Sequence, residues 1–410
     1  MTSVLRQEAS RFVFRPITVN SEGNGKDSPA LAAILRDEIA HGGPITCARF
    51  MEVALYHPEL GYYERDHKIV GQCGDFYTSV SVSELFGQML AFQFAEWLEE
   101  IANRQLPIAN LQIVEAGAHD GQLAEDVLHW LQMRRPDLFA RLEYWILDPS
   151  PRRQLWQRDR LNKFAPRVRW FANWGEIHQV GGVSGVIFAN ELLDAFPVHR
   201  LAWSVAEQQW FEWGVKTAGE SFIWTRLPQL SANVAALREP AVALNNRYGE
   251  LRERAWANLA PVLPDGFVLE RTPRAELWWE TAAQSLRIGK LLTLDYGHNL
   301  NETINPTRPT GTLRAYRNHQ LVTDILADPG EQDITANVNF AGVTLAGERA
   351  KLATIELIEQ SRFLTRVAQR TMRRPASFGE WTSEQARQFQ TLTHPDHLGR
   401  SFSVLLQQRA

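Results

Sequence analysis

The sequence has little cysteine, no long apolar run and no large excess of one charge, and each absence excludes a class of protein. Only Cys47 and Cys73 occur in 410 residues, so thiols alone build neither a disulfide framework nor a metal site, and a reducing compartment is expected. No run of about 18 apolar residues is present, so we predict no transmembrane helix. The formal net charge of −4 argues against binding to nucleic acid or to a membrane surface through a chain-wide basic field.

The composition that is present fits a folded protein. Hydrophobic residues make up 44% of the chain and charged residues 22%, a balance that argues against overall disorder. A chain of 410 residues can form two domains, or one domain with insertions. Residues 1–29 lack the apolar block of a signal peptide and mix arginine with glutamate, so we expect a flexible N-terminal arm that ends in a linker.

Helical patterns come first along the chain. Apolar residues recur at helical spacing in residues 30–43, 45–58 and 82–101, which indicates amphipathic helices. A Gly-Asp-Phe sequence lies between the last two. We therefore predict a helical N-terminal region over residues 30–110 that contains a Gly-Asp-Phe loop.

A different rhythm follows this region. Short apolar runs alternate with helical or polar stretches at residues 111–117, 144–150, 167–173, 185–191 and 289–297. This spacing is typical of β-α-β units. The sequence therefore predicts an α/β fold with a parallel sheet.

The stretch from residue 201 to 285 interrupts that alternation. It is strand-like over 201–213 and helical over 245–260, so we predict an insertion into the sheet domain. The first part of that domain then covers residues 111–200.

The remainder of the sheet domain covers residues 286–410. After the strand near its start, a polar loop leads to apolar residues over 352–368, where we predict a helix. A final strand is expected over residues 401–408.

A glycine turn follows the first strand of the predicted sheet, in IVEAGAHDGQLAEDVL. A dinucleotide site usually has a third glycine between Gly117 and Gly121 for the pyrophosphate, but His119 stands there. S-adenosylmethionine has no phosphates and needs room for its amino-acid end near the turn, a neighbourhood that Glu115 suits. We interpret His119 as a solvated loop histidine rather than a side chain packed on adenosine, and not as a metal ligand, because partner ligands are missing.

A second acid ends the next predicted strand. Asp148 comes 27 residues after Gly121, close to the length of one helix plus one strand, and its carboxylate can accept from both ribose hydroxyls. Strand-end acids and glycine turns also occur as ordinary loop chemistry. Together on successive strands, where open α/β sheets bind ligands, they favour a methyltransferase-like site.

A third group of polar residues follows the strand in VIFANELLDAFPVHRL. Asn190 ends the strand, and Glu191 and Asp194 lie three residues apart, so they share a face if the chain turns helical there. Such residues can hold a cationic or hydrogen-bonding nucleophile against a methyl sulfonium. Alternatively, the two acids only cap the start of a helix. The shared crevice of the strand ends favours the functional interpretation.

The Gly-Asp-Phe loop, in GQCGDFYTS, is the weakest of these signals. Asp75 could reach into the crevice and Phe76 could cover a cofactor. Taken alone, the pattern indicates a turn in which the aspartate caps the following helix.

These pieces, in this order, resemble the MidA-like family of class I S-adenosylmethionine-dependent methyltransferases, which includes a mitochondrial arginine methyltransferase of complex I assembly. The resemblance runs from about Ile45 to Leu406. It rests on eight collinear motifs: FMEVALYHPELGYY, GDFYTS…SELFG, VEAGAHDGQLAEDVL, DPSPRRQLWQRDRL, NELLDAFPVHRL, LLTLDYG, GTLRAYRNH and DITANVNF. It implies a Rossmann-like class I methyltransferase sheet with a helical N-terminal region and an inserted subdomain.

The resemblance also implies roles for individual residues. The cofactor-binding set would be Gly74, Asp75, Phe76, Glu115, Gly117, Gly121, Asp148, Ser150 and Asn190. The catalytic and substrate-facing set would be Asp75, Asn190, Glu191 and Asp194. The strand-end motif Asp295, Tyr296 and Gly297 also matches, and matching C-terminal loops that shape the cleft contain Arg314, Tyr316, Asp333 and Thr335.

The chain departs from the family pattern at two places. His119 stands where the family usually has glycine, and Val80 with Ser81 replaces a usual Pro-Glu. The first exchange would narrow the cofactor pocket, and the second removes a possible active-site carboxylate.

The implied activity is S-adenosylmethionine-dependent methylation of protein arginine, linked to the assembly of respiratory complex I. Two alternatives stay open: a methyltransferase acting on oxygen or nitrogen of a small molecule, and a weakly catalytic assembly factor that retains the fold. The expected partner is a protein, with neither nucleic acid nor metal, and a homodimer is possible. The expected location is a bacterial cytoplasm or, alternatively, the mitochondrial matrix.

Overall fold

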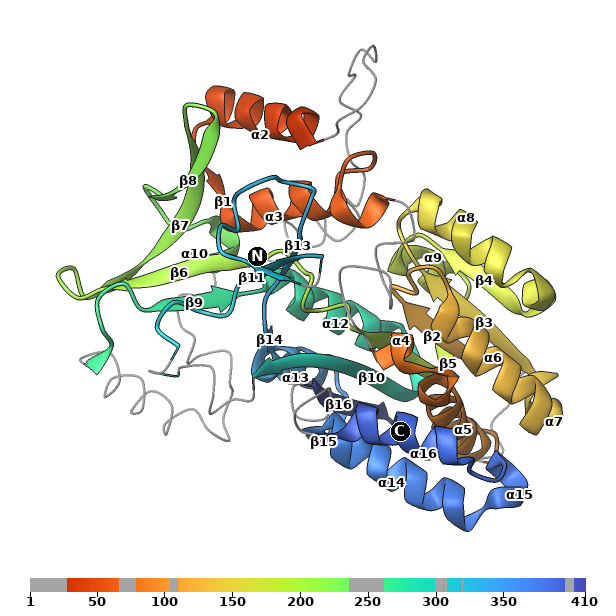
Figure 1. Cartoon of the computed structure of the whole chain (residues 1–410). Helices are drawn as coiled ribbons and strands as arrows, with labels where there is room; N and C mark the ends of the chain where they lie inside the picture. Colours follow the sequence, from red (N-terminus) through yellow and green to blue (C-terminus); the bar gives the residue numbers. More distant parts are fainter. Residues whose placement is uncertain are drawn as a thin grey trace.

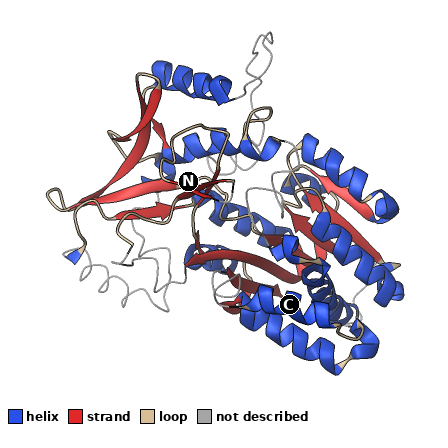
Figure 2. Cartoon of the chain, in the orientation of Figure 1, coloured by secondary structure: helices blue, strands red, loops and turns tan. Residues whose placement is uncertain are grey.

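The computed structural model describes residues 28–65, 79–103, 110–235, 262–298, 305, 308–318, 320–394 and 402–410. Three predicted site residues, Gly74, Asp75 and Phe76, lie outside this part of the chain, as does the helix predicted over 245–260. Figures 1 and 2 show two bodies that meet along the middle of the molecule. One is built on a large sheet and the other on two small sheets.

The large sheet has eight strands, in the order β15-β16-β10-β5-β2-β3-β4, and β14 pairs with β10. Their bounds are β2 Leu111–Ala116, β3 Leu142–Leu147, β4 Val168–Phe171, β5 Val183–Asn190, β10 Leu286–His298, β14 Val338–Asn339, β15 Ala353–Glu359 and β16 Phe402–Arg409. The strands from β10 to β4 are parallel. The predicted parallel sheet is therefore confirmed, as is the final strand, which enters antiparallel between β10 and β15.

Helices cover both faces of this sheet (Figure 2), which explains why its central strands are apolar on both sides. The core on one face includes residues from α5 Glu84–Ala102, α6 Gln122–Arg134, α7 Pro136–Phe139, η3 Asn162–Arg167, α14 Gln360–Arg373, α15 Pro375–Phe378 and α16 Ser383–Thr393, and α4 Ser79–Val82 packs beside it. The other face carries α9 Trp174–Gln179, α12 Pro273–Ser285 and α13 Phe340–Arg349. α8 Pro151–Arg160 follows β3.

The helix predicted over 352–368 is wrong in its first half. Residues 353–359 form β15, and the helix α14 begins at Gln360. The sequence ATIELIE alternates apolar and polar residues and contains β-branched side chains, which favour a strand. In the structure this segment pairs with β16 at the sheet edge, which satisfies its backbone hydrogen bonds. Local helical spacing gives no sign of this pairing.

The second body, which we call the second lobe, combines segments that are far apart in the sequence. Its five-stranded sheet contains β1 Ile45–Thr46, β6 His199–Ser204, β7 Gln209–Ala218, β8 Ser221–Arg226 and β9 Val268–Arg271. Its three-stranded sheet contains β11 Arg314–Arg317, β12 Gln320–Val322 and β13 Asp333–Thr335. Its helices are α2 Ser28–Gly42, α3 Cys47–Tyr56, η1 Tyr62–Glu64 and α10 Ala232–Ala235.

One hydrophobic core joins most of these segments. Phe50 of α3 packs edge-on against Phe222 of β8, with ring centroids 5.6 Å apart, and Ile334 of β13 belongs to the same buried cluster. The helical N-terminal residues and the inserted strands therefore depend on each other for burial. Trp279, in the part of residues 201–285 that forms α12, is instead fully buried against the large sheet, where its indole donates to Gln407 at 2.7 Å.

Candidate functional site

Polar residues gather at the carboxyl ends of the parallel strands. Glu115 is the second-last residue of β2, Asp148 directly follows β3, and Asn190 ends β5. Asp295 lies on β10, one residue beyond Leu294, the partner of Asn190 in the strand register. Because these strands are neighbours in one parallel stretch of sheet, their ends form one edge, where open α/β sheets bind ligands.

The turn between β2 and α6 has an unusual backbone. Gly117, His119 and Gly121 all adopt positive φ, at +73°, +45° and +88°. A Cβ atom added at Gly117 would lie 2.8 Å from Leu192 Cδ1, so glycine allows the two strand-end turns to approach closely. A non-glycine residue at positive φ is uncommon, which makes His119 a locally constrained position despite its polar side chain.

Glu115 has a partner in the protein interior. Its carboxylate accepts from the Tyr144 hydroxyl of β3 at 2.5 Å, and its side chain is buried. Burial raises the pKa of Glu115 to about 8, because a charged carboxylate is poorly solvated there. Tyr144 belongs to the core that contains residues of α5 and α6, so the Glu115 carboxylate points to that side of the sheet.

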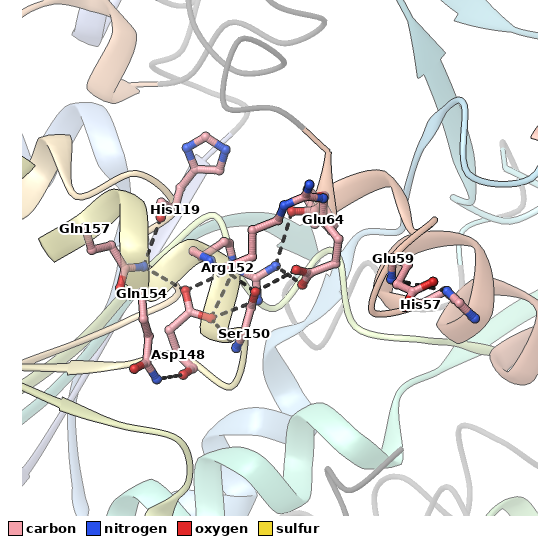
Figure 3. A network of polar contacts seen from close by, with 11 residues as sticks. His57, Glu59, Glu64, His119, Asp148, Ser150, Arg152, Gln154 and Gln157 are labelled. Carbon is pink, nitrogen blue, oxygen red and sulfur yellow. Dashed lines mark hydrogen bonds and ion pairs between the residues drawn. The ribbon is translucent and has the colours of Figure 1, made fainter. Parts of the chain in front are cut away.

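Asp148 is the centre of a buried polar network (Figure 3). Its carboxylate accepts from Arg153 Nε at 3.1 Å, Arg153 Nη2 at 2.9 Å, Gln157 Nε2 at 2.8 Å and the Ser150 backbone N–H at 3.0 Å. Gln157 also donates to the His119 carbonyl at 2.9 Å, which ties α8 to the glycine turn. Asp148 is fully buried, and this network satisfies its charge.

Glu64 of the second lobe completes that network (Figure 3). It accepts from Ser150 Oγ at 2.6 Å and from Arg153 Nη1 at 2.8 Å, while Arg152 donates to its backbone carbonyl. Burial raises the pKa of Glu64, and the neighbouring Arg153 opposes that shift. One guanidinium thus lies between two carboxylates, one from each body of the molecule.

A second group of acids lies at the ends of β5 and β10 and differs from the first. Among the described residues, no arginine or lysine forms an ion pair with Glu191, Asp194 or Asp295. Burial raises the pKa of Glu191 to about 8, and the charge of Asp194 adds to the shift. Burial also raises the pKa values of Asp194 and Asp295. We call these three residues the acid cluster.

Asp295 holds the turn that carries the other two acids. Its carboxylate accepts from the backbone N–H groups of Leu192 at 3.2 Å and Leu193 at 2.8 Å. The Glu191 N–H donates to the Leu294 carbonyl at 2.9 Å, and Glu191 adopts a positive φ of +51°. A strained non-glycine residue that its surroundings fix in place is typical of a functional position.

Two polar atoms of this turn matter for ligand binding. Oδ1 of Asn190 and Oδ1 of Asp194 are buried. The Asn190 oxygen has no hydrogen-bond donor in the described part of the chain, whereas the Tyr296 hydroxyl and the Ala195 backbone N–H lie beside the Asp194 carboxylate. Asn190 donates instead to Glu191 Oε1 at 3.2 Å, and the Ser79 backbone N–H donates to the same oxygen at 3.1 Å. Buried acceptors without donors are rare in proteins, so this turn is suited to a ligand that donates hydrogen bonds.

The second lobe contributes residues to the same region. The Tyr63 hydroxyl donates to Asp333 Oδ1 at 2.6 Å, and the Tyr56 hydroxyl donates to the Ala195 carbonyl at 2.8 Å. The two tyrosine rings lie 5.5 Å apart between centroids. The charge of Asp333 helps to raise the pKa of Glu191, after burial and Asp194, so this carboxylate lies close to the acid cluster.

Sequence reasoning did not identify Glu64, Arg153, Tyr56 or Tyr63. Tyr56, Tyr63 and Arg153 lie inside motifs that carry the family resemblance, and Glu64 directly follows one. Nothing in their spacing indicates that η1 reaches the start of α8. Helix periodicity offers one signal, since Arg153 and Gln157 are four residues apart and share a face of α8. Asp333 lies where the resemblance expects a residue of the cleft.

We also searched the described residues for metal sites and for helices that could span a membrane. They contain no group of three or more histidine, cysteine, aspartate or glutamate residues arranged to hold a metal ion. None of the described helices is long and apolar enough to cross a membrane.

Comparison with known proteins identifies the family. Residues 89–358 match the model of a family described as "Putative S-adenosyl-L-methionine-dependent methyltransferase". A crystal structure of a protein from Burkholderia thailandensis, bound to S-adenosyl-homocysteine, superposes with a TM-score of 0.76 at 30% identity and covers 95% of both chains.

Curated relatives agree with this assignment. "Protein arginine methyltransferase NDUFAF7 homolog, mitochondrial" of Drosophila melanogaster is 28% identical over 82% of this chain and 75% of its own length. The protein of the corresponding name from Homo sapiens is 26% identical over 86% of this chain and 77% of its own length. The chain belongs to this family, and it is an S-adenosylmethionine-dependent methyltransferase of Rossmann-like fold.

Proposed function

We propose that the chain methylates the guanidinium of an arginine side chain in a protein substrate. The acid cluster carries this proposal, because its carboxyls have no basic partner within the described residues. Asp194 and Asp295 are buried, and Glu191 is partly buried. Burying such groups is unfavourable unless a cation joins them. The named activity of the curated relatives, protein arginine methylation, supports the same acceptor.

The described residues fit the cofactor. Gly117 and Gly121 keep side chains out of the turn beside the crevice, and the unpaired Asn190 Oδ1 can accept a hydrogen bond from an ammonium group. We assign Gly117, Gly121, Asp148, Ser150 and Asn190 to cofactor binding. Contact between Asp148 and a ribose requires Arg153 to give up part of its hold on that carboxylate.

S-adenosylmethionine supplies a methyl group on a sulfonium, whose departure as a neutral thioether needs no general acid. The protein's contribution is therefore alignment of the acceptor nitrogen and exclusion of water. We assign Asn190, Glu191 and Asp194 to this task. The Asp295 carboxylate fixes their turn through two backbone N–H groups, so the acceptor meets a preorganised set of oxygens.

The acid cluster can also dispose of the proton that the acceptor loses. A guanidinium has a pKa above about 12 in water, so it arrives charged and draws the carboxyls of Glu191 and Asp194 toward their ionised forms. Planar guanidinium groups bind carboxylates through paired hydrogen bonds. After methyl transfer, a carboxylate of this pair accepts the proton from the acceptor nitrogen.

The remaining assignments are proposals that the described residues support less directly. Gly74, Asp75 and Phe76 stay predictions from the sequence, although Ser79, the first described residue after them, is hydrogen-bonded to Glu191. Glu115 contacts Tyr144 in the interior, which supports a role in shaping the turn rather than direct contact with the cofactor. A subunit of a respiratory complex is the partner that the family resemblance favours. Both the bacterial cytoplasm and the mitochondrial matrix are compatible locations, and a homodimer stays a prediction.

Transfer of labelled methyl groups to a cell lysate tests the proposal. The protein is incubated with labelled S-adenosylmethionine and the lysate, and labelled residues are located by mass spectrometry. We expect methylarginine in a small number of proteins with the wild-type chain, and loss of this label with Asp194→Asn. Glu207→Gln, which alters an exposed ion pair with Arg226 in the second lobe, serves as the matched control and keeps the label.

Other outcomes contradict the arginine assignment. Label in free metabolites would identify a small-molecule methyltransferase. Label on lysine or a carboxyl-containing side chain would retain the protein substrate and replace the acceptor.

A further inference from the structure

The short helix η1 of the second lobe lies between the two groups of acids. Tyr63 and Glu64 are consecutive residues, yet their side chains reach different places. The Tyr63 hydroxyl binds Asp333 near the acid cluster, while the Glu64 carboxylate binds Ser150 and Arg153 beside Asp148. One turn of chain therefore contacts residues beside both groups of acids.

On the cofactor side, Glu64 competes with Asp148 for one guanidinium. Arg153 donates Nη1 to Glu64 at 2.8 Å and Nη2 to Asp148 at 2.9 Å. The Arg153 guanidinium also lies 3.4 Å from the Tyr63 carbonyl. All three charged residues are buried, so few other groups can replace these contacts.

On the acceptor side, Tyr63 fixes a carboxylate that lies outside the large sheet. Asp333 belongs to β13, which is separated from β10 in sequence and pairs only with β11 among the described strands. The Ala336 backbone N–H donates to the Asp194 carbonyl at 2.9 Å, so the segment that carries Asp333 is attached directly to the acid cluster. The phenol hydroxyl at 2.6 Å selects the orientation of the Asp333 carboxylate.

We propose that Tyr63 and Glu64 are positioning residues for methyl transfer, with Tyr63 orienting Asp333 toward the cationic acceptor and Glu64 holding Arg153 so that Asp148 can bind the cofactor ribose. The acceptor half of this inference rests on the proposed function. The cofactor half rests on the fold and the family alone.

The two residues act in different ways. Without the Glu64 charge, Arg153 has Asp148 as its remaining anionic partner in the network and binds it more strongly, so a ribose competes less well for Asp148. Without the Tyr63 hydroxyl, the Asp333 carboxylate loses the donor that η1 supplies and is held less firmly in its direction, which weakens the alignment of the acceptor.

Two isosteric variants separate these effects. We expect Glu64→Gln to raise the Kd for S-adenosyl-homocysteine about tenfold in calorimetry, whereas Tyr63→Phe changes it less than twofold. In transfer of labelled methyl to the protein fraction of a cell lysate, we expect Tyr63→Phe to lower kcat/KM for the acceptor about tenfold. At saturating cofactor, Glu64→Gln transfers at nearly the wild-type rate.

Two further variants distinguish positioning from a structural role. Glu64→Asp keeps the charge and is expected to restore much of the affinity for S-adenosyl-homocysteine. The double variant Tyr63→Phe/Asp333→Asn is expected to transfer no more slowly than Asp333→Asn, because Tyr63 acts through that carboxylate. Residues that only stabilise the fold would lower the melting temperature, with the Kd and the rate ratio unchanged well below it.

The outcomes separate this inference from the acceptor assignment. The lysate readout counts label on any protein residue, and the binding readout needs no acceptor, so failure of arginine methylation leaves both arms informative. Equal effects of Tyr63→Phe and Glu64→Gln on the Kd would overturn the division of roles. Additive losses in the double variant would overturn the link between Tyr63 and Asp333.

Discussion

The two groups of acids at the strand ends differ in one respect, their counter-charge. Asp148 and Glu64 share the guanidinium of Arg153 and are satisfied within the protein. The acid cluster at the ends of β5 and β10 forms no ion pair with a described arginine or lysine, and the pKa of Glu191 is raised to about 8 by burial and by the charge of Asp194. Both groups lie along the same edge of one sheet.

This difference indicates that the Asp148–Arg153–Glu64 network stabilises the fold, whereas the acid cluster is suited to binding a cationic ligand. A buried carboxylate with a guanidinium partner is part of the folded structure, and removing the partner destabilises it. A buried carboxyl without a cation stays protonated at little expense and becomes charged when a cation binds. Substitutions in the paired network should therefore lower the stability of the fold, and substitutions in the acid cluster should lower the rate of methyl transfer.

The largest effect is expected from the paired side. Arg153→Met leaves Asp148 and Glu64 buried without their shared cation, so we expect the free energy of unfolding to fall by about 4 kcal/mol. Denaturant unfolding followed by tryptophan fluorescence measures this change. Arg226→Met, which breaks the exposed pair with Glu207, is the control, and an equally small loss for both variants would show that the buried network is not structural.

The next effect is expected from the acid cluster. Asp194→Asn keeps the shape of a side chain that is 5% exposed but cannot carry the charge that a guanidinium needs, so we expect methyl transfer to fall about a hundredfold. The Kd for S-adenosyl-homocysteine should stay within twofold of the wild-type value. If the variant instead bound the cofactor more weakly and transferred methyl at the wild-type rate at saturating cofactor, Asp194 would have a role in cofactor binding and not in transfer.

A smaller loss is expected for the acid that holds the turn. In Asp295→Asn, one carboxylate oxygen that faces backbone N–H groups is replaced by an amide NH₂, which cannot accept from Leu192 or Leu193. We expect transfer to fall about tenfold as the turn loosens. Comparing the rate with the melting temperature separates the two contributions, and a variant that transfers at the wild-type rate would exclude a positioning role for this aspartate.

The smallest expected effect is a gain, in the stability of a variant at Glu191. Because the pKa of folded Glu191 is raised from its ordinary 4.5 to about 8, the stability that its protonated form contributes is present below pH 4.5 and is lost as the pH rises through 8. Glu191→Gln keeps an acceptor for Ser79 and carries no charge, so we expect a gain of about 1 kcal/mol at pH 8 and little change at pH 4.5. Unfolding free energies of both chains at the two pH values provide the measurement, and a loss of stability at pH 8 would contradict an unpaired carboxyl.

The sequence predicts the large sheet well because its signals are local. Strands buried on both faces appear as continuous apolar runs, as in residues 183–190, and their spacing implies the helices between them. β15 was missed because one apolar stretch contained both a strand and the start of a helix. Such a boundary depends on pairing with β16, which comes more than forty residues later.

In the candidate site, too, the features that depend on local sequence are predictable and those that depend on distant residues are not. Residues at strand ends, such as Asp148 and Asn190, are predictable because topology brings parallel strand ends together. Their partners are not predictable, since Glu64 reaches Ser150 across 86 residues and Tyr63 reaches Asp333 across 270. The charge state of each acid depends on those distant partners, so the sequence can name the acids but cannot tell a neutralised one from one that awaits a cation.

The antiparallel pairing of β16 with β10 has a consequence for folding during synthesis on the ribosome. β10 lies in the interior of the sheet and needs residues 402–409 for its antiparallel ladder, so this edge of β10 stays open until those residues have been synthesised. Chaperones that shield open strand edges would be needed throughout that interval. A variant without β16 would expose the same edge of β10 permanently and would be prone to aggregate.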